Sequence, residues 1–258
     1  MCLVVFNWRP DHTQPLLLAA NRDEFYERPA KPFHWWPSDN RYDHGLLAGI
    51  DLKAKGTWMA FDQAGRFAIL TNIRPGFVGV DGQRTRGEIP TNYIASGLGP
   101  YAFGLSMGNS IHHYAGFNLL LGEPGSLFWM SSNHRVPTSI EPGIHGLSND
   151  SLDTPWPKVE RAKEQMLNVT PDFEQAGFST SLLTDKTIAP DHELPSTGVP
   201  LDWERLLSAQ TITSDTYGTR SRCLFKIVGD EYHLLDQQLD RQGEVEHQSR
   251  FQWSITQG

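Results

Sequence analysis

The sequence predicts an α+β protein in which two sheets pack together and helices cover the outside. Strand-like segments dominate both ends of the 258-residue chain, and segments with helical spacing lie between them. Strands and helices that are segregated along a chain in this way are typical of α+β proteins. With 38% hydrophobic and 20% charged residues, the composition is that of an ordinary globular protein, so we expect a single domain over residues 1–258.

The N-terminal segment predicts two adjacent buried strands. Residues 2–8 are almost wholly apolar, residues 10–14 supply turn chemistry, and residues 15–20 form a second apolar run. Antiparallel strands joined by a short loop bring the start of the first near the end of the second, so Cys2 should neighbour the polar residues 21–24. Because burying unpaired charge is costly, these side chains need partners, which a functional site would supply.

Residues 26–52 are expected to be loop-like, because they contain Pro29, Pro32 and Pro37 among scattered polar residues. Long irregular segments often line binding sites. The aromatic cluster in residues 33–36 is interpreted either as a lid over an apolar ligand or as a hydrophobic plug that closes the edge of a sheet.

Hydrophobic spacing and turn residues predict the remaining elements. We expect hairpins of residues 57–61 with 67–72 and of 117–121 with 126–130, an exposed loop at 74–86, helices at 88–96, 101–107, 157–169, 172–183 and 202–209, a surface loop at 190–200, and strands at 221–228, 232–236 and 251–255. Arg220 and Arg222 should share one face of their strand. His112 and His113, adjacent on an extended stretch, should face opposite ways and not bind one metal together.

Charge and composition disfavour several classes of function. The net charge of −8 and the lack of a lysine or arginine block argue against nucleic acid or an anionic membrane surface as the main partner. No apolar run approaches the roughly 20 residues of a membrane span, and the start lacks a secretory signal, so we expect no integral membrane segment and a cytoplasmic location. Two cysteines cannot form a disulfide framework. No nucleotide, flavin or zinc motif is present, and no metal site is expected.

Cys2 has an unusual chemical option. If Met1 is removed, the thiol and a free α-amine with an ordinary pKa of about 8 belong to the same residue. Activation of a nucleophile by its own N-terminal amine is a known catalytic arrangement, and a cation such as Arg22 would favour the thiolate. The alternative is that Cys2 is only a small apolar residue at the start of a strand.

Several separated motifs resemble the NRDE family, also called the transport-and-Golgi-organisation type. They are Met1-Cys2, Ala20-Asn21-Arg22-Asp23-Glu24-Phe25, Gly56-Thr57-Trp58, Leu70-Thr71-Asn72, Gly146-Leu147-Ser148-Asn149, Thr154-Pro155-Trp156-Pro157-Lys158 and Tyr217-Gly218-Thr219-Arg220-Ser221. That family is similar to the N-terminal-nucleophile (Ntn) hydrolases of the choloylglycine hydrolase and penicillin V acylase branch. The resemblance implies a four-layer αββα sandwich of two mainly antiparallel sheets.

The resemblance also implies roles for individual residues. It implies Cys2 as the nucleophile, Arg22 with Asp23 as the pair that holds its thiol and amine, Asn72 as the oxyanion donor, Asn149 as a group that binds the terminal amine or substrate, and Arg220 as an arginine beside the nucleophile. One departure stands out, because the acylases place the carboxylate three positions after the arginine, where this chain has Phe25. Either the chain bends at Arg22, or Glu24 takes the carboxylate role, or the catalytic geometry is lost on a retained scaffold.

Two hypotheses of function follow from these observations. The first is an amidohydrolase that attacks a small non-peptide amide through an acyl-enzyme and requires no cofactor. The second is a non-catalytic binding or trafficking protein for haem or a lipid-like ligand, which the family resemblance allows. Its candidate ligand contacts are Glu24, His34, Trp35 and Trp36, with Cys2 as a further haem contact; the sequence does not predict the oligomeric state.

Overall fold

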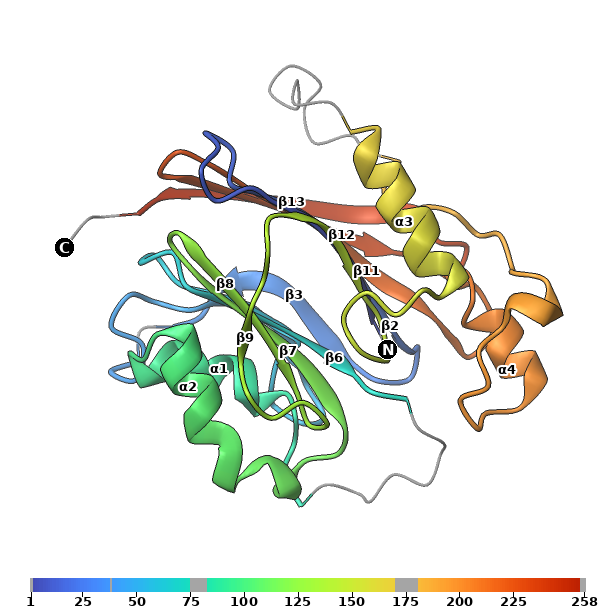
Figure 1. Ribbon diagram of the computed structural model, residues 1–258, viewed down its shortest axis with the longest axis horizontal. Helices are drawn as coiled ribbons and strands as arrows, with labels where there is room; N and C mark the ends of the chain where they lie inside the picture. Colours follow the sequence, from blue (N-terminus) through green and yellow to red (C-terminus); the bar gives the residue numbers. More distant parts are fainter. Residues whose placement is uncertain (1, 38, 75–82, 170–180, 256–258) are drawn as a thin grey trace.

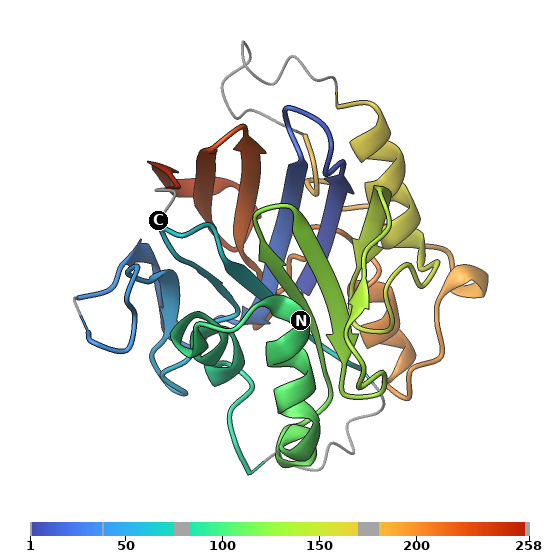
Figure 2. The ribbon, with the colours of Figure 1, turned by 60° about the vertical axis from the view of Figure 1, so that its left-hand side comes forward.

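A computed structural model describes residues 2–37, 39–74, 83–169 and 181–255. Two antiparallel sheets face one another, and helices cover the outer face of each, as Figure 1 shows from one side and Figure 2 after a turn of 60°. The predicted α+β, four-layer αββα arrangement is therefore confirmed.

The first sheet combines strands from both ends of the chain. Its six strands run in the order β10-β1-β2-β11-β12-β13, and every neighbouring pair is antiparallel. The strands are β1 (Cys2–Trp8), β2 (Leu16–Phe25), β10 (Gly143–Leu147), β11 (Tyr217–Val228), β12 (Glu231–Leu239) and β13 (Val245–Ser254). Strand β2 is longer than expected, because it includes the polar residues 21–24.

The second sheet follows the order of the chain, from β3 to β9, and is antiparallel throughout. Its seven strands are β3 (Ala30–Trp35), β4 (Leu47–Asp51), β5 (Met59–Phe61), β6 (Phe67–Asn72), β7 (Phe117–Glu123), β8 (Ser126–Ser131) and β9 (Thr138–Ser139). The expectation that residues 26–52 are loop-like was wrong, because β3 and β4 lie there. Strand β3 tolerates Pro32 since it is an edge strand.

Each sheet carries its own helices. Helix α1 (Glu88–Ser96) packs on β5 and β6, and α2 (Pro100–Ser106) on β7 and β8. On the other side of the molecule, α3 (Pro157–Leu167) packs on β1 and β10, with α4 (Leu201–Leu206) beside it (Figure 1). Most of the helix expected at 172–183 falls outside the described residues, and Leu182 and Leu183 form a turn. No helix among the described residues is long and apolar enough to cross a bilayer.

Short 3₁₀ helices occur at Met107–Asn109, Ile111–His113 and Asp191–Glu193. The second corrects the expectation for His112 and His113. They lie on a helical turn rather than an extended stretch, so their ring centroids are only 3.9 Å apart.

The two-residue period of β2 sorts its side chains between the two faces of the sheet. Leu16, Leu18 and Ala20 belong to the apolar cluster between the sheets, whereas Leu17 and Ala19 belong to the cluster beneath α3. This alternation continues through residues 21–24. It directs Arg22 and Glu24 between the sheets and Asn21 and Asp23 toward the helices.

A β-bulge changes the same pattern on β11. The register with β2 shifts between Thr219 and Ser221, so that Arg220 is the extra residue. Arg222 then donates to Asn21 and Thr211 on the helix side, while Arg220 donates to the backbone carbonyls of residues 25, 26 and 28. The prediction that Arg220 and Arg222 share a face was therefore wrong.

Aromatic side chains fill the space between the sheets. Phe225 of β11 is fully buried, and its ring centroid lies 4.8 Å from that of Phe61 and 5.4 Å from that of Phe67 on the opposite sheet. Tyr232 and Trp253 also contact it. These contacts hold the two sheets at a fixed separation.

Replacing Phe225 with alanine should therefore lower the free energy of unfolding by about 3–5 kcal/mol, because it removes a buried ring from a closely packed core. Chemical denaturation monitored by circular dichroism measures this loss. The control is Leu167→Ala at the end of α3, where the leucine is 72% exposed and the expected loss is below about 1 kcal/mol. Equal losses in the two variants would contradict this account of the core.

Candidate functional site

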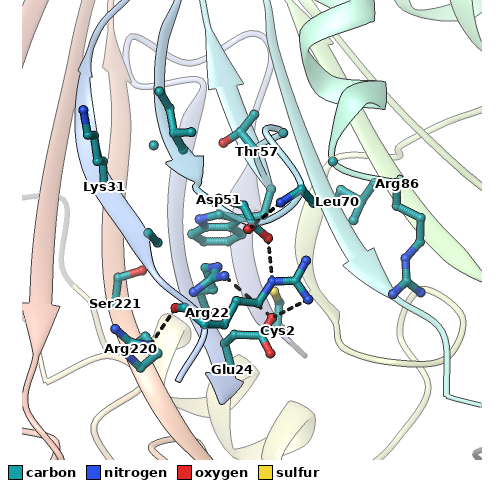
Figure 3. A pocket seen from close by; sticks show the side chains of 18 of the residues that line it. Cys2, Arg22, Glu24, Lys31, Asp51, Thr57, Leu70, Arg86, Arg220 and Ser221 are labelled. Atoms are coloured by element: carbon teal, nitrogen blue, oxygen red, sulfur yellow. Dashed lines mark hydrogen bonds and ion pairs between the residues drawn. The ribbon is translucent and has the colours of Figure 1, made fainter. Parts of the chain in front are cut away.

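A cavity of about 290 Å³ opens between the two sheets at the C-terminal end of β2 (Figure 3). Small-molecule sites start at about this size. Six of the residues singled out from the sequence line it, namely Cys2, Arg22, Asp23, Glu24, Asn72 and Arg220. Residues of β3, β4 and β6 complete its walls. The fold thus brings distant parts of the chain to one place.

Cys2 begins a row of side chains across the first sheet. It pairs with Arg22 on β2, Arg22 pairs with Ser221 on β11, and Ser221 pairs with Gln238 on β12. All four line the cavity. At about 4.8 Å per strand, this row spans roughly 14 Å.

The Cys2 thiol is a free, buried group with 6% of the residue exposed. Burial raises the pKa of the Cys2 thiol, although the nearby Arg22 guanidinium acts in the opposite direction. The Cys2 carbonyl accepts a hydrogen bond of 3.2 Å from the Ser148 hydroxyl. Cys2 is therefore held in place through its backbone, and its burial disfavours ionisation of the thiol.

Three ionic contacts connect the charged residues around Cys2. Glu24 Oε2 lies 3.7 Å from Arg22 Nη2 and 3.8 Å from Arg28 Nη1, and Arg28 Nε lies 2.6 Å from Asp51 Oδ2. Figure 3 shows this chain of side chains across the cavity. Sequence reasoning missed Arg28 and Asp51, because it treated their segment as a loop.

Asp23 occupies a different environment from Glu24. Its carboxylate accepts a 2.7 Å hydrogen bond from the Thr219 hydroxyl on the helix side of the sheet. Burial raises the pKa of Asp23, and the Lys158 ammonium opposes this rise. Because β2 continues its regular alternation, Glu24 is the carboxylate that shares a face with Arg22 and Cys2, while the carboxylate of Asp23 lies on the other face.

Asn72 and Asn149 meet at the end of β6. The Asn149 side chain donates through Nδ2 to the Asn72 carbonyl at 2.9 Å, and the Arg74 amide donates to the Asn149 carbonyl at 2.7 Å. Asn149 is fully buried and is not among the residues that line the cavity. It thus fixes the backbone that carries Asn72, whereas the predicted contact of Asn149 with substrate stays a prediction.

The proposed aromatic ligand contacts lie elsewhere. His34, Trp35 and Trp36 are not among the residues that line the cavity. Trp35 contacts the Trp253 ring edge-on at the margin of the core, and the Trp36 indole donates to the Ala48 carbonyl. Phe33, the first residue of the cluster, does line the cavity, so the structure favours the edge-plug interpretation for Trp35 and Trp36.

A buried charge cluster beneath the first sheet was also missed. Arg74 Nη1 lies 2.9 Å from Glu204 Oε2, and both side chains are buried, which corrects the expectation of an exposed loop at Arg74. Nearby, Lys158 is 2% exposed, and burial together with Arg74 lowers its pKa to about 8. The sequence did contain a signal for a buried lysine, because Lys158 lies beside Val159 and Ala162 on the apolar face of the predicted helix.

Metal ligation finds no support in the described part of the chain. Within residues 2–37, 39–74, 83–169 and 181–255, no three or more His, Cys, Asp or Glu side chains are grouped to hold an ion.

Comparison with known proteins gives matches over nearly the whole chain. The profile of the family described as Transport and Golgi organisation 2 matches residues 1–234. The Transport and Golgi organization protein 2 homologs of Bos taurus and Homo sapiens are each 30% identical to it over 254 residues, covering 89% of this chain and 90% of each relative. The Mus musculus homolog is 26% identical over 249 residues, covering 88% of both chains. Among solved structures, the C2A mutant of the conjugated bile acid hydrolase from Clostridium perfringens aligns with a TM-score of 0.40 and 9% identity, covering 99% of this chain and 98% of its own.

The loop that carries Asn149 should be stabilised in a pH-dependent way by His145 and Asp153. The Asp153 carboxylate lies 2.7 Å from His145 Nδ1 and accepts from the Gly146 amide at 2.9 Å. The hydrogen bond to Asp153 raises the pKa of His145. The stability that the charged His145–Asp153 pair adds is therefore fully present below the ordinary histidine pKa of about 6.5. It is lost as pH rises through the raised pKa of His145 in the folded protein.

The substitution Asp153→Asn tests this interaction, because it removes the charge while asparagine, like aspartate, tolerates the positive φ of 58° at this position. The loss of unfolding free energy relative to the unmodified chain should be larger at pH 5.5 than at pH 9, by about 1 kcal/mol. In a His145→Gln background, Asp153→Asn should lower the free energy of unfolding by the same amount at both pH values. A pH-independent loss in the presence of His145 would contradict the assignment.

Proposed function

The chain belongs to the Transport and Golgi organisation 2 family, and from this premise and its cavity we propose that it is an N-terminal cysteine amidohydrolase. The observation that carries the proposal is the position of Cys2. The thiol of the second residue lines a cavity of about 290 Å³ beside Arg22. A cavity of this size fits a small non-peptide amide better than a folded chain.

The proposed reaction proceeds through an acyl-enzyme. Once Met1 is removed, the Cys2 α-amine takes the thiol proton and the sulfur attacks the amide carbonyl. The Asn72 side chain donates to the oxyanion. The C–N bond then breaks, and the leaving amine takes up the proton from the α-amine. Water attacks the thioester carbon, a C–O bond replaces the C–S bond, and the acid leaves while Cys2 regains its proton.

The supporting residues have distinct tasks in this mechanism. Arg22 lies directly opposite Cys2 and favours the thiolate. Glu24 holds the Arg22 guanidinium from the same side of the sheet. Asp23 lies at the end of the same strand, with its carboxylate on the other face. This carboxylate is available to the α-amine, because the amine is a backbone group and is not confined to one face of the sheet. The two carboxylates thus divide the role that a single aspartate has in the acylases.

The alternative is a binding protein for a lipid-like ligand or haem on the same scaffold. The raised pKa of Cys2 disfavours the thiolate, which both nucleophilic attack and iron ligation need, so it favours a lipid-like ligand over haem. A haem site that uses Cys2 and His34 together does not fit, since His34 is not among the residues lining the cavity around Cys2. Cys2 alone would then be the contact with the iron.

Removal of Met1 should decide the reactivity of Cys2. In protein whose N-terminus is Cys2, the α-amine should bring the midpoint of iodoacetamide alkylation below the ordinary thiol value of about 8.5. In protein that retains Met1, burial should keep the midpoint above it. Peptide mapping by mass spectrometry reports the N-terminus and the alkylated site together.

The matched control is Cys2→Ala, which should lose all turnover of any amide substrate while its melting temperature stays within a few degrees. A midpoint that does not respond to Met1 removal would exclude the amine as the base. A large fall in melting temperature for Cys2→Ala would instead indicate a purely structural cysteine.

Haem titration tests the alternative. If Cys2 is the iron ligand, added haem should give a defined absorption band that disappears in Cys2→Ala and persists in His34→Ala. A band that survives in both variants would indicate nonspecific adsorption and would count against haem as the ligand.

A further inference from the structure

The cavity has a charge opposite to that of the chain as a whole. Six cationic residues line it, namely Arg22, Arg28, Lys31, Arg84, Arg86 and Arg220, against the four carboxylate residues Asp23, Glu24, Asp51 and Asp236. The net charge of the chain is −8. Of these four, Asp23 turns its carboxylate to the other face of the sheet, where it accepts from the Thr219 hydroxyl. A net positive cavity in an acidic protein indicates a ligand with negative charge.

Three of the six cations have a carboxylate partner. Arg22 and Arg28 share Glu24, Arg28 also pairs with Asp51, and Arg84 Nε lies 2.5 Å from Glu88 Oε1. Within the described residues, Lys31, Arg86 and Arg220 form no ion pair, and Lys31 is exposed to solvent. Arg220 directs Nη1 at three backbone carbonyls and lies over the Tyr26 ring. The Arg86 guanidinium makes one hydrogen bond to the described part of the chain, from Nη1 to the Gly116 carbonyl at 2.8 Å.

Close packing of two glycines holds Arg86 in place. The Thr57 amide donates to the Gly87 carbonyl at 2.8 Å, so that the chain at Gly56 crosses directly over Gly87. A Cβ atom added to Gly56 would lie 2.4 Å from the Gly87 carbonyl carbon, so only glycine fits at this position. The Gly56-Thr57-Trp58 motif therefore fixes the residue that follows Arg86, and with it the origin of the Arg86 side chain.

Arg86 faces the nucleophile and its neighbours. It interacts electrostatically with Arg28, Cys2 and Glu24. Burial lowers the pKa of Arg86, but a guanidinium keeps its charge across the physiological range. Figure 3 shows its side chain on the wall facing that of Arg220 and Ser221. A rigidly placed guanidinium with unused donors can receive a planar anion.

We infer that Arg86 binds a carboxylate group of the ligand, so that the substrate is an amide which also carries a carboxylate. This inference deepens the proposed function and rests on it for the reaction, whereas the anion preference of the cavity is a separate property. A carboxylate is favoured over a phosphate, because Glu24 and Asp51 would repel a second negative charge. Arg86 is thus assigned to substrate specificity rather than to activation of the thiol.

Two alkylating reagents that differ in charge test this assignment without knowledge of the substrate. Iodoacetate carries a carboxylate and iodoacetamide is neutral, yet both alkylate the same thiol. We divide the rate constant for iodoacetate by that for iodoacetamide at Cys2, and normalise this ratio by the same ratio for N-acetylcysteine. The normalised ratio should be at least about three. Arg86→Gln should reduce this normalised ratio to about one, and Arg86→Lys should retain much of it.

The ratio separates ligand recognition from thiol activation, because a change in the thiolate fraction alters both rates equally. Arg135→Gln, at an exposed arginine outside the cavity lining, is the matched control and should leave the ratio unchanged. A salt series on the unchanged chain gives a second measurement that needs no variant, since raising NaCl from 50 to 500 mM should lower the ratio by screening. A normalised ratio near one in the unchanged chain would overturn the assignment.

Two further arms complete the test. Acetate should compete with iodoacetate more strongly than inorganic phosphate does, and the reverse order would overturn the choice of a carboxylate. If Cys2 resists both reagents, the hydrolase proposal fails, and the anion preference is then measured on Ser221→Cys in a Cys2→Ser background. Ser221 lines the same cavity, so a ratio insensitive to Arg86→Gln at this reporter would overturn the inference by itself.

Discussion

The site depends on the regular alternation of β2 through four consecutive polar residues. A strand that ended at Ala20 would leave residues 21–24 free to turn in any direction, whereas a continued strand fixes each side chain on one face. Arg22 and Glu24 are thereby placed beside Cys2, and Asn21 and Asp23 beneath the helices. Partners on both faces compensate the cost of burying these groups, since Asn21 donates to the carbonyls of Leu183 and Gln210.

The burial of Cys2 sets a requirement on the chemistry. A thiol in an apolar, nearly closed position has a raised pKa, and the cations near it do not reverse this shift. The sheet therefore supplies position, and the proposed mechanism takes its reactivity from the α-amine that removal of Met1 would expose.

Local patterns predicted much of this fold. The strand pairs, the hairpins and the helix at Pro157–Leu167 follow from apolar periodicity and turn residues in single windows. Strands β3 and β4 were not predicted. Strand β3 exposes most of its side chains and contains a proline, as an edge strand can, so its sequence lacks the usual strand pattern. The bulge at Arg220 was also beyond prediction, since it is a property of the pairing with β2 and not of the β11 sequence.

For the candidate site, the motifs located the residues, but their faces and partners came from tertiary structure. Arg28 with Asp51 and Arg74 with Glu204 are pairs separated by 23 and 130 positions, and no local pattern joins such residues. Arg86 is the clearest case. Its sequence context is a run of glycine and arginine typical of a solvated loop, and only the contact of Gly56 with Gly87 makes it part of the cavity.

The outermost strands have a consequence for how this protein behaves at high concentration. Strand β13 is ten residues long and borders the first sheet, so its outer edge offers unpaired backbone groups to other chains. Its exposed side chains include Glu246, His247 and Arg250, and the facing edge strand β3 carries Lys31 and Pro32. Charges and proline at sheet edges oppose the addition of a further strand from another molecule. Two wide sheets can thus enclose a polar cavity without becoming templates for aggregation.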